Sequence, residues 1–322
     1  MVDCEDTAHG ESPLENHFSR QSILPKTIMK IDIKDFEYNG DKKFKIKKTP
    51  TKIKDFYESE EQYELLIAEI KDKIDKLQSL MYADNRYAML IMLQASDAAG
   101  KDGTIRAVLS GVNPAGIAVH SFKRPTSEEL DHDFMWRNML KMPERGKMVF
   151  HNRSYYEELL VVKVHPEILI NSEKIPTEFT KDLDKVWAHR YEDIRNYEKY
   201  LNRNGIIVLK IYLNVSKKVQ GERLIERIQD PTKNWKFEEG DVKERDFWND
   251  YQSAYEEMVN QTAAKYAPWY VIPADDKKNM RLIVSSIILH HLKSIDMKYP
   301  AADEARQATL EQLIKVIEQQ NG

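Results

Sequence analysis

The stretch "QASDAAGKDGTIRAVL", Gln94 to Leu109, combines features of a phosphate-binding loop with two aspartates, Asp97 and Asp102. Such a loop reads glycine, four residues, glycine, lysine and a hydroxyl residue, because backbone N–H groups and a lysine must surround phosphate oxygens. Ala95 replaces the first glycine and Asp102 the hydroxyl residue, so the pattern matches in part. The expected strand–loop–helix context favours a phosphate loop over an ordinary glycine-containing turn. The candidate phosphate-contacting residues are Ala98, Ala99, Gly100, Lys101, Asp102, Gly103 and Thr104.

The two aspartates indicate a metal ion. A carboxylate next to a phosphate is strongly repelled at the low effective dielectric of a protein site, so Asp97 needs a cation between the two groups. Mg²⁺ is expected, because it prefers oxygen ligands and combines one or two carboxylates with substrate phosphates. Asp102 leaves two interpretations open: a metal contact, or a negative charge favoured at a helix N-terminus by about 0.3–1 kcal/mol.

A second group of polar residues lies in "VFHNRSYYEELLVV", at the end of another expected strand. In phosphate-loop enzymes this strand end often supplies an acidic residue that organises Mg²⁺, and here Asn152 and Arg153 stand there. Arg153 can bind phosphate through two N–H groups. The alternative is a strand-to-helix turn in which Asn152 or Ser154 caps the helix. Glu157 either supplies the missing carboxylate or lies on an exposed helix surface.

Basic side chains follow a strand end and recur in "SKKVQGERLIERIQDPTKNWKF", residues 216–237. Asp230 and Pro231 should break the helix there, which predicts a lid. Each cation is individually compatible with a solvated surface position, but their common placement predicts a channel for a polyanion. The candidates are Lys123, Arg124, Arg137, Arg223, Arg227, Lys233 and Lys236. The scattered histidines lack metal-ligand spacing, and the pair His290-His291 belongs to an apolar helix, which argues against a phosphohistidine mechanism.

These residues must be positioned by a mostly parallel sheet. The apolar run 87–93 precedes the loop and is typical of a buried parallel strand. Helices are expected at 60–84, at 104–110, at 130–140 after a capping box of Thr126 and Glu129, and at 182–203 before Gly205. Alternation of strands and helices predicts a doubly wound, three-layer α/β fold with a five-stranded, mostly parallel sheet, to which the basic segment adds a helical lid. The other expected strands are 117–122, 147–151, 206–213 and 269–274.

The bulk composition excludes several classes of protein. The chain has 322 residues, 41% hydrophobic, and a net charge of −4, so it does not resemble a nonspecific nucleic-acid binder. Cys4 is the only cysteine and fits a reducing cytoplasm, and no apolar run suggests a membrane span or signal segment. We expect a tail and lead-in at 1–53, with a solvated charged run at 42–54, a phosphate-loop domain at 54–298 with its lid at about 216–240, and a C-terminal helix at 299–322. The aromatic segment "WNDYQSAYEEM" is interpreted as packing.

Three ordered motifs resemble polyphosphate kinase family 2, whose members are phosphate-loop kinases. The family patterns "DAAGK-x-GT", "[FV]-x-[DN]-RS-x-Y" and "R-x-x-x-R…P-x-K-x-WK" correspond to Asp97–Thr104, Phe150–Tyr156 and Arg223–Lys236. The similarity extends over about 54–292 and includes "YQSAYEEM" and "APWYVIPADDKKNMR". Many members have aspartate where this chain has Asn152. With the following "YYEELLVVKVH", the chain resembles the subgroup that phosphorylates both nucleoside mono- and diphosphates.

This resemblance implies reversible phosphoryl transfer between inorganic polyphosphate and a nucleotide, with Mg²⁺ bridging the phosphates. Asp97 and Asn152 would contact the metal, with Glu157 assisting the uncharged Asn152. Lys101 and the loop amides would hold phosphate, and Arg153 would stabilise the transferring group. Glu157 would belong to the same phosphate- and nucleotide-binding set. Lys123, Arg124, Arg137, Arg223, Arg227 and Lys233 would bind polyphosphate. The implied partners are polyphosphate and adenine and guanine nucleotides, without nucleic acid or membrane, in a cytoplasmic homo-oligomer.

Phosphoryl transfer depends on alignment and charge neutralisation, so direct in-line attack by the nucleotide's terminal phosphate oxygen is expected. That oxygen is anionic at neutral pH, and no strong general base is required. Two other functions remain open on the residues alone. One is an ATP-dependent nucleoside monophosphate kinase, and the other is a noncatalytic sensor of nucleotide or phosphate.

Overall fold

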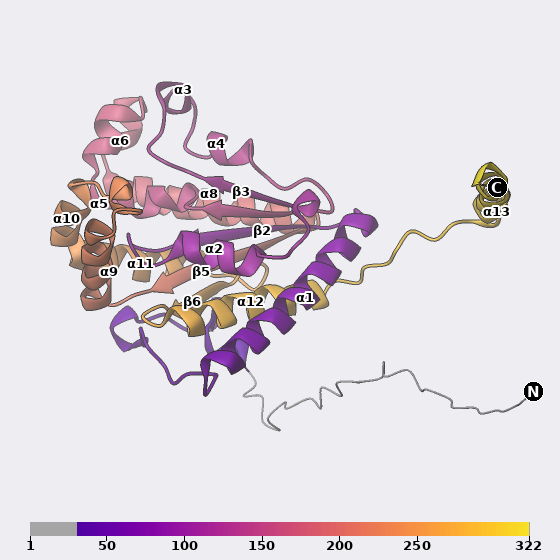
Figure 1. Ribbon diagram of the computed structural model, residues 1–322. Coiled ribbons are helices and arrows are strands. Elements are labelled where there is room, and N and C mark those ends of the chain that lie inside the picture. Colours follow the sequence, from indigo (N-terminus) through magenta and orange to yellow (C-terminus); the bar gives the residue numbers. More distant parts are fainter. Residues whose placement is uncertain (1–30, 322) are drawn as a thin grey trace, which may run out of the picture. The chain divides into compact units, whose positions relative to one another are not determined.

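The computed structural model describes residues 31–321 and contains a six-stranded sheet with the order β1-β6-β5-β2-β4-β3 (Figure 1). Strands β2 to β6 are parallel, and β1 pairs with β6 in the antiparallel sense. The predicted mostly parallel α/β fold is confirmed, but the prediction of five strands was wrong by one. The missed strand β1 has only two residues, too few for a periodic pattern. The strands are β1 Glu37–Tyr38, β2 Ala88–Gln94, β3 Ile117–Ser121, β4 Met148–Asn152, β5 Ile206–Asn214 and β6 Trp269–Pro273.

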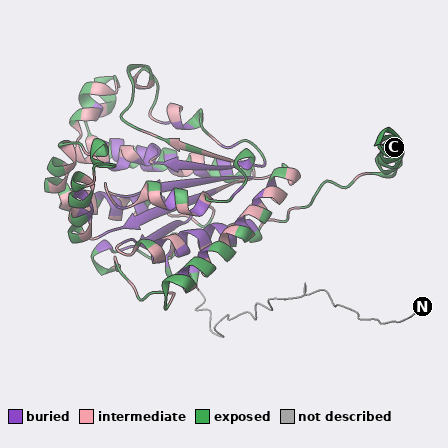
Figure 2. Cartoon of the chain, in the orientation of Figure 1, coloured by how far each residue is buried: buried purple, intermediate pink, exposed green. Residues whose placement is uncertain are grey.

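The central strands are buried on both faces, which explains their continuous apolar sequences. Every residue of β2, β4 and β6 is buried. Successive side chains of a strand point to opposite faces, so Met89 and Ile91 belong to one core cluster while Leu90 and Met92 belong to the other. Figure 2 shows these buried strands between two layers of helices.

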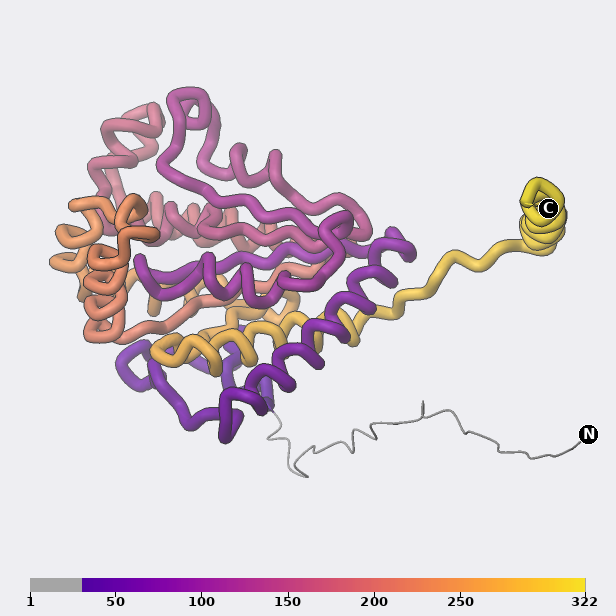
Figure 3. The backbone as a smooth tube through the Cα atoms, viewed as in Figure 1, coloured from indigo at the N-terminus to yellow at the C-terminus, as the bar shows by residue number. Residues whose placement is uncertain are grey.

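One layer consists of α1 Glu60–Asp84, α2 Lys101–Leu109 and α12 Lys277–Lys293, and α1 runs beside α12 (Figure 3). The apolar period expected for α1 is confirmed, since Ile67, Ile74 and Met81 are buried. The opposite layer contains α8 Leu183–Arg203 and α11 Trp248–Thr262, whose apolar residues join the second core cluster. Asp182 caps α8, and Gly205 follows it with φ +76°. Both ends of that helix were predicted correctly.

The segment after β3 differs from the prediction. The capping box is present, with Thr126 N–H donating to Glu129 and Glu129 N–H donating to Thr126. The predicted helix 130–140 is wrong, because the chain forms two four-residue helices, α3 Ser127–Leu130 and α4 Trp136–Met139. Asp133 accepts the N–H of Met135 and starts a separate turn between them. Leu140 is exposed, so little packing favours a longer helix.

The segment predicted as a lid begins with α9 Lys217–Gln229, which ends before Pro231 as expected. Short elements follow, and Figure 1 shows α9, α10 and α11 at the end of the sheet from which α2 starts. No helix among residues 31–321 is long and apolar enough to cross a membrane. The predicted tail up to residue 30 lies outside the described residues. The remaining elements are η1 Ile33–Asp35, η2 Ile46–Lys48, η3 Pro114–Gly116, η4 Tyr155–Leu159, α5 Val161–Val164, α6 Glu167–Ser172, α7 Thr177–Thr180, η5 Asn234–Lys236, α10 Gly240–Lys243, η6 Glu244–Phe247 and α13 Glu304–Asn321.

Candidate active site

The loop between β2 and α2 has the backbone of an anion-binding turn. Ala98 and Gly100 have positive φ values of 57° and 111°. The φ of Gly100 is one that residues with a side chain rarely adopt, so the backbone conformation requires glycine there. α2 starts at the next residue and directs its first backbone N–H groups toward the loop, as an anion site requires. Ala99 is a buried residue of the loop itself, and Gly103 lies in the first turn of α2.

Lys101 and Thr104 of the loop motif both have local hydrogen-bond partners. The Lys101 ammonium donates to the carbonyl oxygens of Ala95 at 2.7 Å and Ser96 at 3.3 Å. Desolvation lowers the pKa of Lys101 to about 8, with the nearby Arg153 adding to the effect. Thr104 is buried, and its hydroxyl donates to the Gly100 carbonyl at 3.0 Å. Thr104 therefore supports α2, while the loop carbonyls engage two of the three N–H donors of Lys101.

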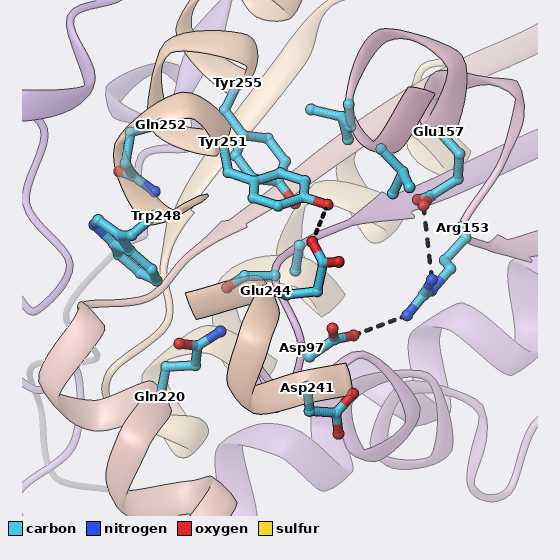
Figure 4. A pocket seen from close by; sticks show the side chains of 14 residues that line it. Asp97, Arg153, Glu157, Gln220, Asp241, Glu244, Trp248, Tyr251, Gln252 and Tyr255 are labelled. Carbon is cyan, nitrogen blue, oxygen red and sulfur yellow. Dashed lines mark hydrogen bonds and ion pairs between the residues drawn. The ribbon is translucent and has the colours of Figure 1, made fainter. Parts of the chain in front are cut away.

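Asp97, Arg153 and Glu157 form a chain of charges across the loop (Figure 4). Arg153 Nη2 donates to Asp97 Oδ1 at 2.8 Å, and Arg153 Nη1 lies 3.7 Å from Glu157 Oε2. Glu157 raises the pKa of Arg153, and desolvation raises the pKa of Glu157 itself. The exposed-surface interpretation of Glu157 is wrong, because its side chain is only 17% exposed and faces Arg153. Arg153 also has φ +65°, an uncommon conformation for this residue type that turns the chain at the end of β4.

Asn152 lies opposite Asp102 rather than capping a helix. Its Nδ2 donates to Asp102 Oδ1 at 2.7 Å, whereas Ser154 caps η4 by accepting the N–H of Tyr156. The Oδ1 atom of Asn152 is buried and has no hydrogen-bond partner among the described residues. A buried oxygen without a donor suits a cation, and the oxygens of Asp97 and Asp102 are the same hard ligand type. Within residues 31–321 no group of three or more His, Cys, Asp or Glu is arranged to hold a metal ion by itself.

The sequence did not single out Gln94, the last residue of β2. In one orientation of the Gln94 side-chain amide, both of its polar atoms form hydrogen bonds. The nitrogen then donates to Glu157 Oε1 at 2.8 Å, and the oxygen accepts the N–H of Ser154 at 3.0 Å. Gln94 thus ties β2 to the segment that carries Arg153 and Glu157. Only its place at the end of an expected central strand, next to the loop, signalled this role.

A buried polar network supports the same segment from below. Glu198 Oε1 accepts the hydroxyls of Tyr155 at 3.1 Å and Tyr156 at 2.7 Å. Lys210 Nζ donates to Glu198 Oε2 at 2.7 Å and to the Thr262 carbonyl at 2.7 Å. Glu198 and Lys210 are both 0% exposed, so each charge depends on the other and on these hydrogen bonds. The network fixes η4, and with it the backbone between Arg153 and Glu157.

An open pocket lies between the loop and α11. Figure 4 shows Tyr251, Tyr255 and Trp248 on one side of it and Asp97 and Arg153 on the other. The packing interpretation of this aromatic segment holds for Tyr255, which stacks on Tyr212 with 4.3 Å between ring centroids. It fails for Tyr251 and Trp248, which line the pocket. The pocket is also lined by polar residues that the sequence did not single out: Ser96, Gln220, Asp241, Glu244 and Gln252.

The predicted anion-binding residues separate into different environments. Arg223 is buried and donates to the carbonyl oxygens of Ala99, Ala274 and Asp275 at 2.8, 2.8 and 3.0 Å, so it braces the phosphate loop from behind. Lys123 and Arg124 are exposed after β3. Arg137 lies against that turn and donates to the Lys123 carbonyl at 2.8 Å.

The lid cations lie closer to the pocket and pair with acidic residues. Arg227 Nη1 is 3.3 Å from Asp241 Oδ2, and desolvation is the main cause of the raised pKa of Asp241. Lys236 Nζ lies 3.6 Å from Asp102 Oδ2, and Lys233 pairs with Asp230. The predicted lid therefore brings Lys236 to Asp102 at the start of α2 and Arg227 to the pocket residue Asp241, while Lys233 stays with its neighbour Asp230.

Comparisons with known proteins agree with this geometry. The family model described as Polyphosphate kinase 2 matches residues 57–300. An "ADP-polyphosphate phosphotransferase" of Rhodopseudomonas palustris is 47% identical over 287 residues, covering 88% of this chain and 98% of the relative. An "AMP/ADP-polyphosphate phosphotransferase" of Meiothermus ruber is 39% identical and covers 85% of this chain and 98% of the relative.

A solved structure gives the same result for the fold. The crystal structure of Polyphosphate Kinase 2 from Arthrobacter aurescens superposes with a TM-score of 0.77 at 30% identity. That alignment covers 87% of this chain and 95% of the other. The family match spans the loop, the Asn152–Glu157 segment, the lid and α11 together. The chain belongs to the polyphosphate kinase 2 family.

Proposed function

We propose that this enzyme transfers a phosphoryl group reversibly between inorganic polyphosphate and nucleotides, carrying AMP to ADP and ADP to ATP. The observation that supports this most is the charge chain Asp97–Arg153–Glu157 across a phosphate loop. Such a site alternates acidic and basic groups and suits two polyanionic substrates that arrive with a cation. Relatives named for phosphotransfer to ADP and to AMP or ADP support the same reaction.

Lys101, the loop amides and Arg153 hold the phosphates in this proposal. Arg153 is always charged and can exchange Asp97 for a phosphate while Glu157 keeps its other side in place. Lys101 exchanges the carbonyls of Ala95 and Ser96 for phosphate oxygens. These residues align a terminal polyphosphate phosphorus with the nucleotide's attacking oxygen, and alignment with charge neutralisation lowers the barrier.

Asp97 and Asn152 would hold Mg²⁺, with Asp102 beside them. The ion supplies charge neutralisation between the phosphates and the carboxylates when it is bound. The protein's own part is to keep these oxygens close to the loop. Arg153 occupies one Asp97 oxygen, and Lys236 lies near Asp102, so both carboxylates already have positive neighbours.

The aromatic side of the pocket suits the nucleotide. Trp248 and Tyr251 offer ring faces, and Gln252 offers an amide, opposite the cations of the loop. A nucleotide needs contacts for both an aromatic base and its phosphates, whereas polyphosphate needs cations alone. Ring contacts are tolerant of the base, so we include guanine with adenine nucleotides. We place the reaction in the cytoplasm.

The test is an ATP-formation assay with purified enzyme, long-chain polyphosphate and Mg²⁺, with AMP and ADP offered separately. The expected result is ADP followed by ATP from AMP, and ATP from ADP. ATP from ADP alone would overturn the part of the proposal that concerns monophosphates. Phosphorylation of AMP by ATP without polyphosphate, together with no product from polyphosphate, would identify an ordinary nucleotide kinase. Tight binding with no transfer would identify a sensor.

A further inference from the structure

We propose that four exposed lysines, Lys47, Lys48, Lys52 and Lys54, form a second binding surface for polyphosphate outside the catalytic pocket. This lysine strip would hold the part of a long chain that extends beyond the phosphate loop and lid. The inference rests on the proposed function for the identity of the polyanion. All four residues precede residue 57, where the match to the family model begins.

The charge of this segment is unusual for a chain with a net charge of −4. Residues 42–54 contain seven lysines and no acidic residue. Its apolar residues point inward, with Phe44 and Ile46 buried, and the four lysines of the strip are exposed. In the part of the chain that the structure describes, only Lys45 of this run pairs with a carboxylate, at 3.2 Å from Glu256. The remaining ammonium groups repel one another and favour a bound polyanion.

Hydrogen bonds fix the segment at the carboxyl ends of the parallel strands, which is the end of the sheet where the phosphate loop lies. Asn214, the last residue of β5, donates to the carbonyls of Thr49 and Pro50 at 3.3 and 3.4 Å. Asp275, just after β6, donates its N–H to the Thr51 carbonyl at 2.9 Å and accepts the Thr51 hydroxyl at 2.7 Å. The carboxyl ends of parallel strands lie at the same end of the sheet. The lysine strip and the phosphate loop therefore both lie at that end.

A short path of protein contacts connects this segment to the loop. Arg223 donates both to the Asp275 carbonyl at 3.0 Å and to the Ala99 carbonyl at 2.8 Å. Lys277 stands at the start of α12, two residues after Asp275, and carries a further exposed charge. Its Nζ lies 4.0 Å from Oε2 of Glu226 on α9. Lys277 thus links the helix that begins the predicted lid to the Asp275 region that holds the strip segment.

Among the described residues, the carboxylates of Asp55, Asp275 and Asp276 form no ion pair with a lysine of the strip, and each accepts a hydrogen bond from a protein donor. Asp275 accepts the Thr51 hydroxyl and the Ser216 N–H. Asp276 caps α12 by accepting the Asn279 N–H at 2.7 Å, and Asp55 accepts the Asn279 side-chain amide at 3.0 Å. These oxygens orient the backbone under the lysines. The ammonium groups remain available to phosphate oxygens.

The experiment compares two donors in two variants. The first variant changes Lys47, Lys48, Lys52 and Lys54 to Gln. The control changes four exposed lysines elsewhere to Gln. Two of them, Lys185 and Lys199, lie on α8, and the other two, Lys293 and Lys298, lie at and after the C-terminal end of α12. Both variants lose the same formal charge, so a general electrostatic effect would affect both alike. KM and kcat are measured with long-chain polyphosphate and with tripolyphosphate, at low and high salt.

The strip variant is expected to raise KM for long-chain polyphosphate by about tenfold at low salt, because four phosphate contacts are lost, and the difference should shrink as salt rises. Its KM for tripolyphosphate and its kcat with either donor should equal those of the unmodified enzyme. An unchanged KM for the long chain would overturn the proposal. An equal rise in the control variant, or with tripolyphosphate, would also overturn it.

Direct binding separates this inference from the proposed function. Isothermal titration calorimetry with long-chain polyphosphate and no nucleotide measures affinity whether or not transfer occurs. Weaker binding by the strip variant alone supports the second surface even if the enzyme transfers no phosphate. Equal affinity of the strip variant and the unmodified protein overturns the surface even if transfer from polyphosphate is observed.

Discussion

Two regions of the active site hold their charges in different ways. One is its floor, which consists of the phosphate loop, Gln94, Arg153 and Glu157. The other is the predicted lid, residues 216–240. In the floor, Arg153 pairs with Asp97, 56 residues away in sequence, and Gln94 is fully buried beside Ser154. In the lid, Lys233 pairs with Asp230, three residues away, and its side chain is 64% exposed. Long-range contacts between packed strands hold the floor in one arrangement. The lid's exposed local pairs can exchange partners at little cost.

This difference indicates that the two regions contribute to different steps, the floor to phosphoryl transfer and the lid to polyanion binding. Groups already oriented by the fold need no reorganisation when the reaction starts, so the floor should govern the rate of transfer. Cations held in weak exposed pairs are released when a polyanion arrives, so the lid should govern its binding. Changes in the floor should therefore lower kcat, and changes in the lid should raise KM.

The largest expected effect is in the floor. Asp97→Asn and Lys101→Ala should each lower turnover at least about 100-fold, or about 2.7 kcal/mol of transition-state stabilisation. Asp97→Asn removes the charge that faces Arg153 and that would hold the proposed Mg²⁺, and Lys101→Ala removes the only side-chain ammonium of the loop. The measurement is kcat at saturating polyphosphate, ADP and Mg²⁺.

Asp230→Asn is the matched control, because it changes a carboxylate in the lid whose partners are local. It should leave kcat within about threefold of the unmodified enzyme, as expected for an exposed ion pair. Thermal unfolding of all three variants should remain near the original transition. Near-normal kcat in Asp97→Asn or Lys101→Ala would show that the floor does not contain the transfer site.

A smaller effect is expected in the lid. Arg227→Gln should raise KM for polyphosphate about three- to tenfold at low salt with little change in kcat, and high salt should reduce the difference. Asp241→Asn supplies the reciprocal test, since it removes the carboxylate 3.3 Å from Arg227 and frees that guanidinium. Its KM for polyphosphate should fall. A rise in KM with Asp241→Asn, or a salt-independent effect of Arg227→Gln, would mean that the pair supports lid structure.

The floor was largely predictable from sequence because its chemistry is local to two strand ends. Asp97 and Lys101 lie in one continuous loop, and Asn152 and Arg153 follow directly on the next strand in space. Parallel strands that end at one edge bring such segments together without further information. The burial of Glu157 was not predictable in the same way, because it depends on Gln94 and Arg153 packing over a turn with φ +65°.

Contacts between distant segments account for most of what the sequence did not reveal. β1 forms only because Glu37 and Tyr38 pair with Tyr270 and Trp269, more than 200 residues later. Arg223 carries the same charge as Arg227 one helical turn away. Yet Arg223 is 8% exposed and binds backbone carbonyls, while Arg227 faces Asp241. Spacing places two arginines on one helix face but does not show which one is buried.

The smallest expected effect concerns pH and belongs to the floor alone. Burial lowers the pKa of Lys101 to about 8, so its ammonium form is lost as pH rises through that value. Because kcat/KM reports the free enzyme, it should fall about threefold between pH 7.5 and 8.5, following the protonated fraction of a group with this pKa. Arg227→Gln should keep the same pH profile, since the lid does not set this pKa. Lys101→Arg should retain its charge and remove the decline, whatever its absolute rate. A kcat/KM for the unmodified enzyme that stays level to pH 9.5 would contradict the assignment, and it would show that Lys101 remains fully protonated between the loop carbonyls.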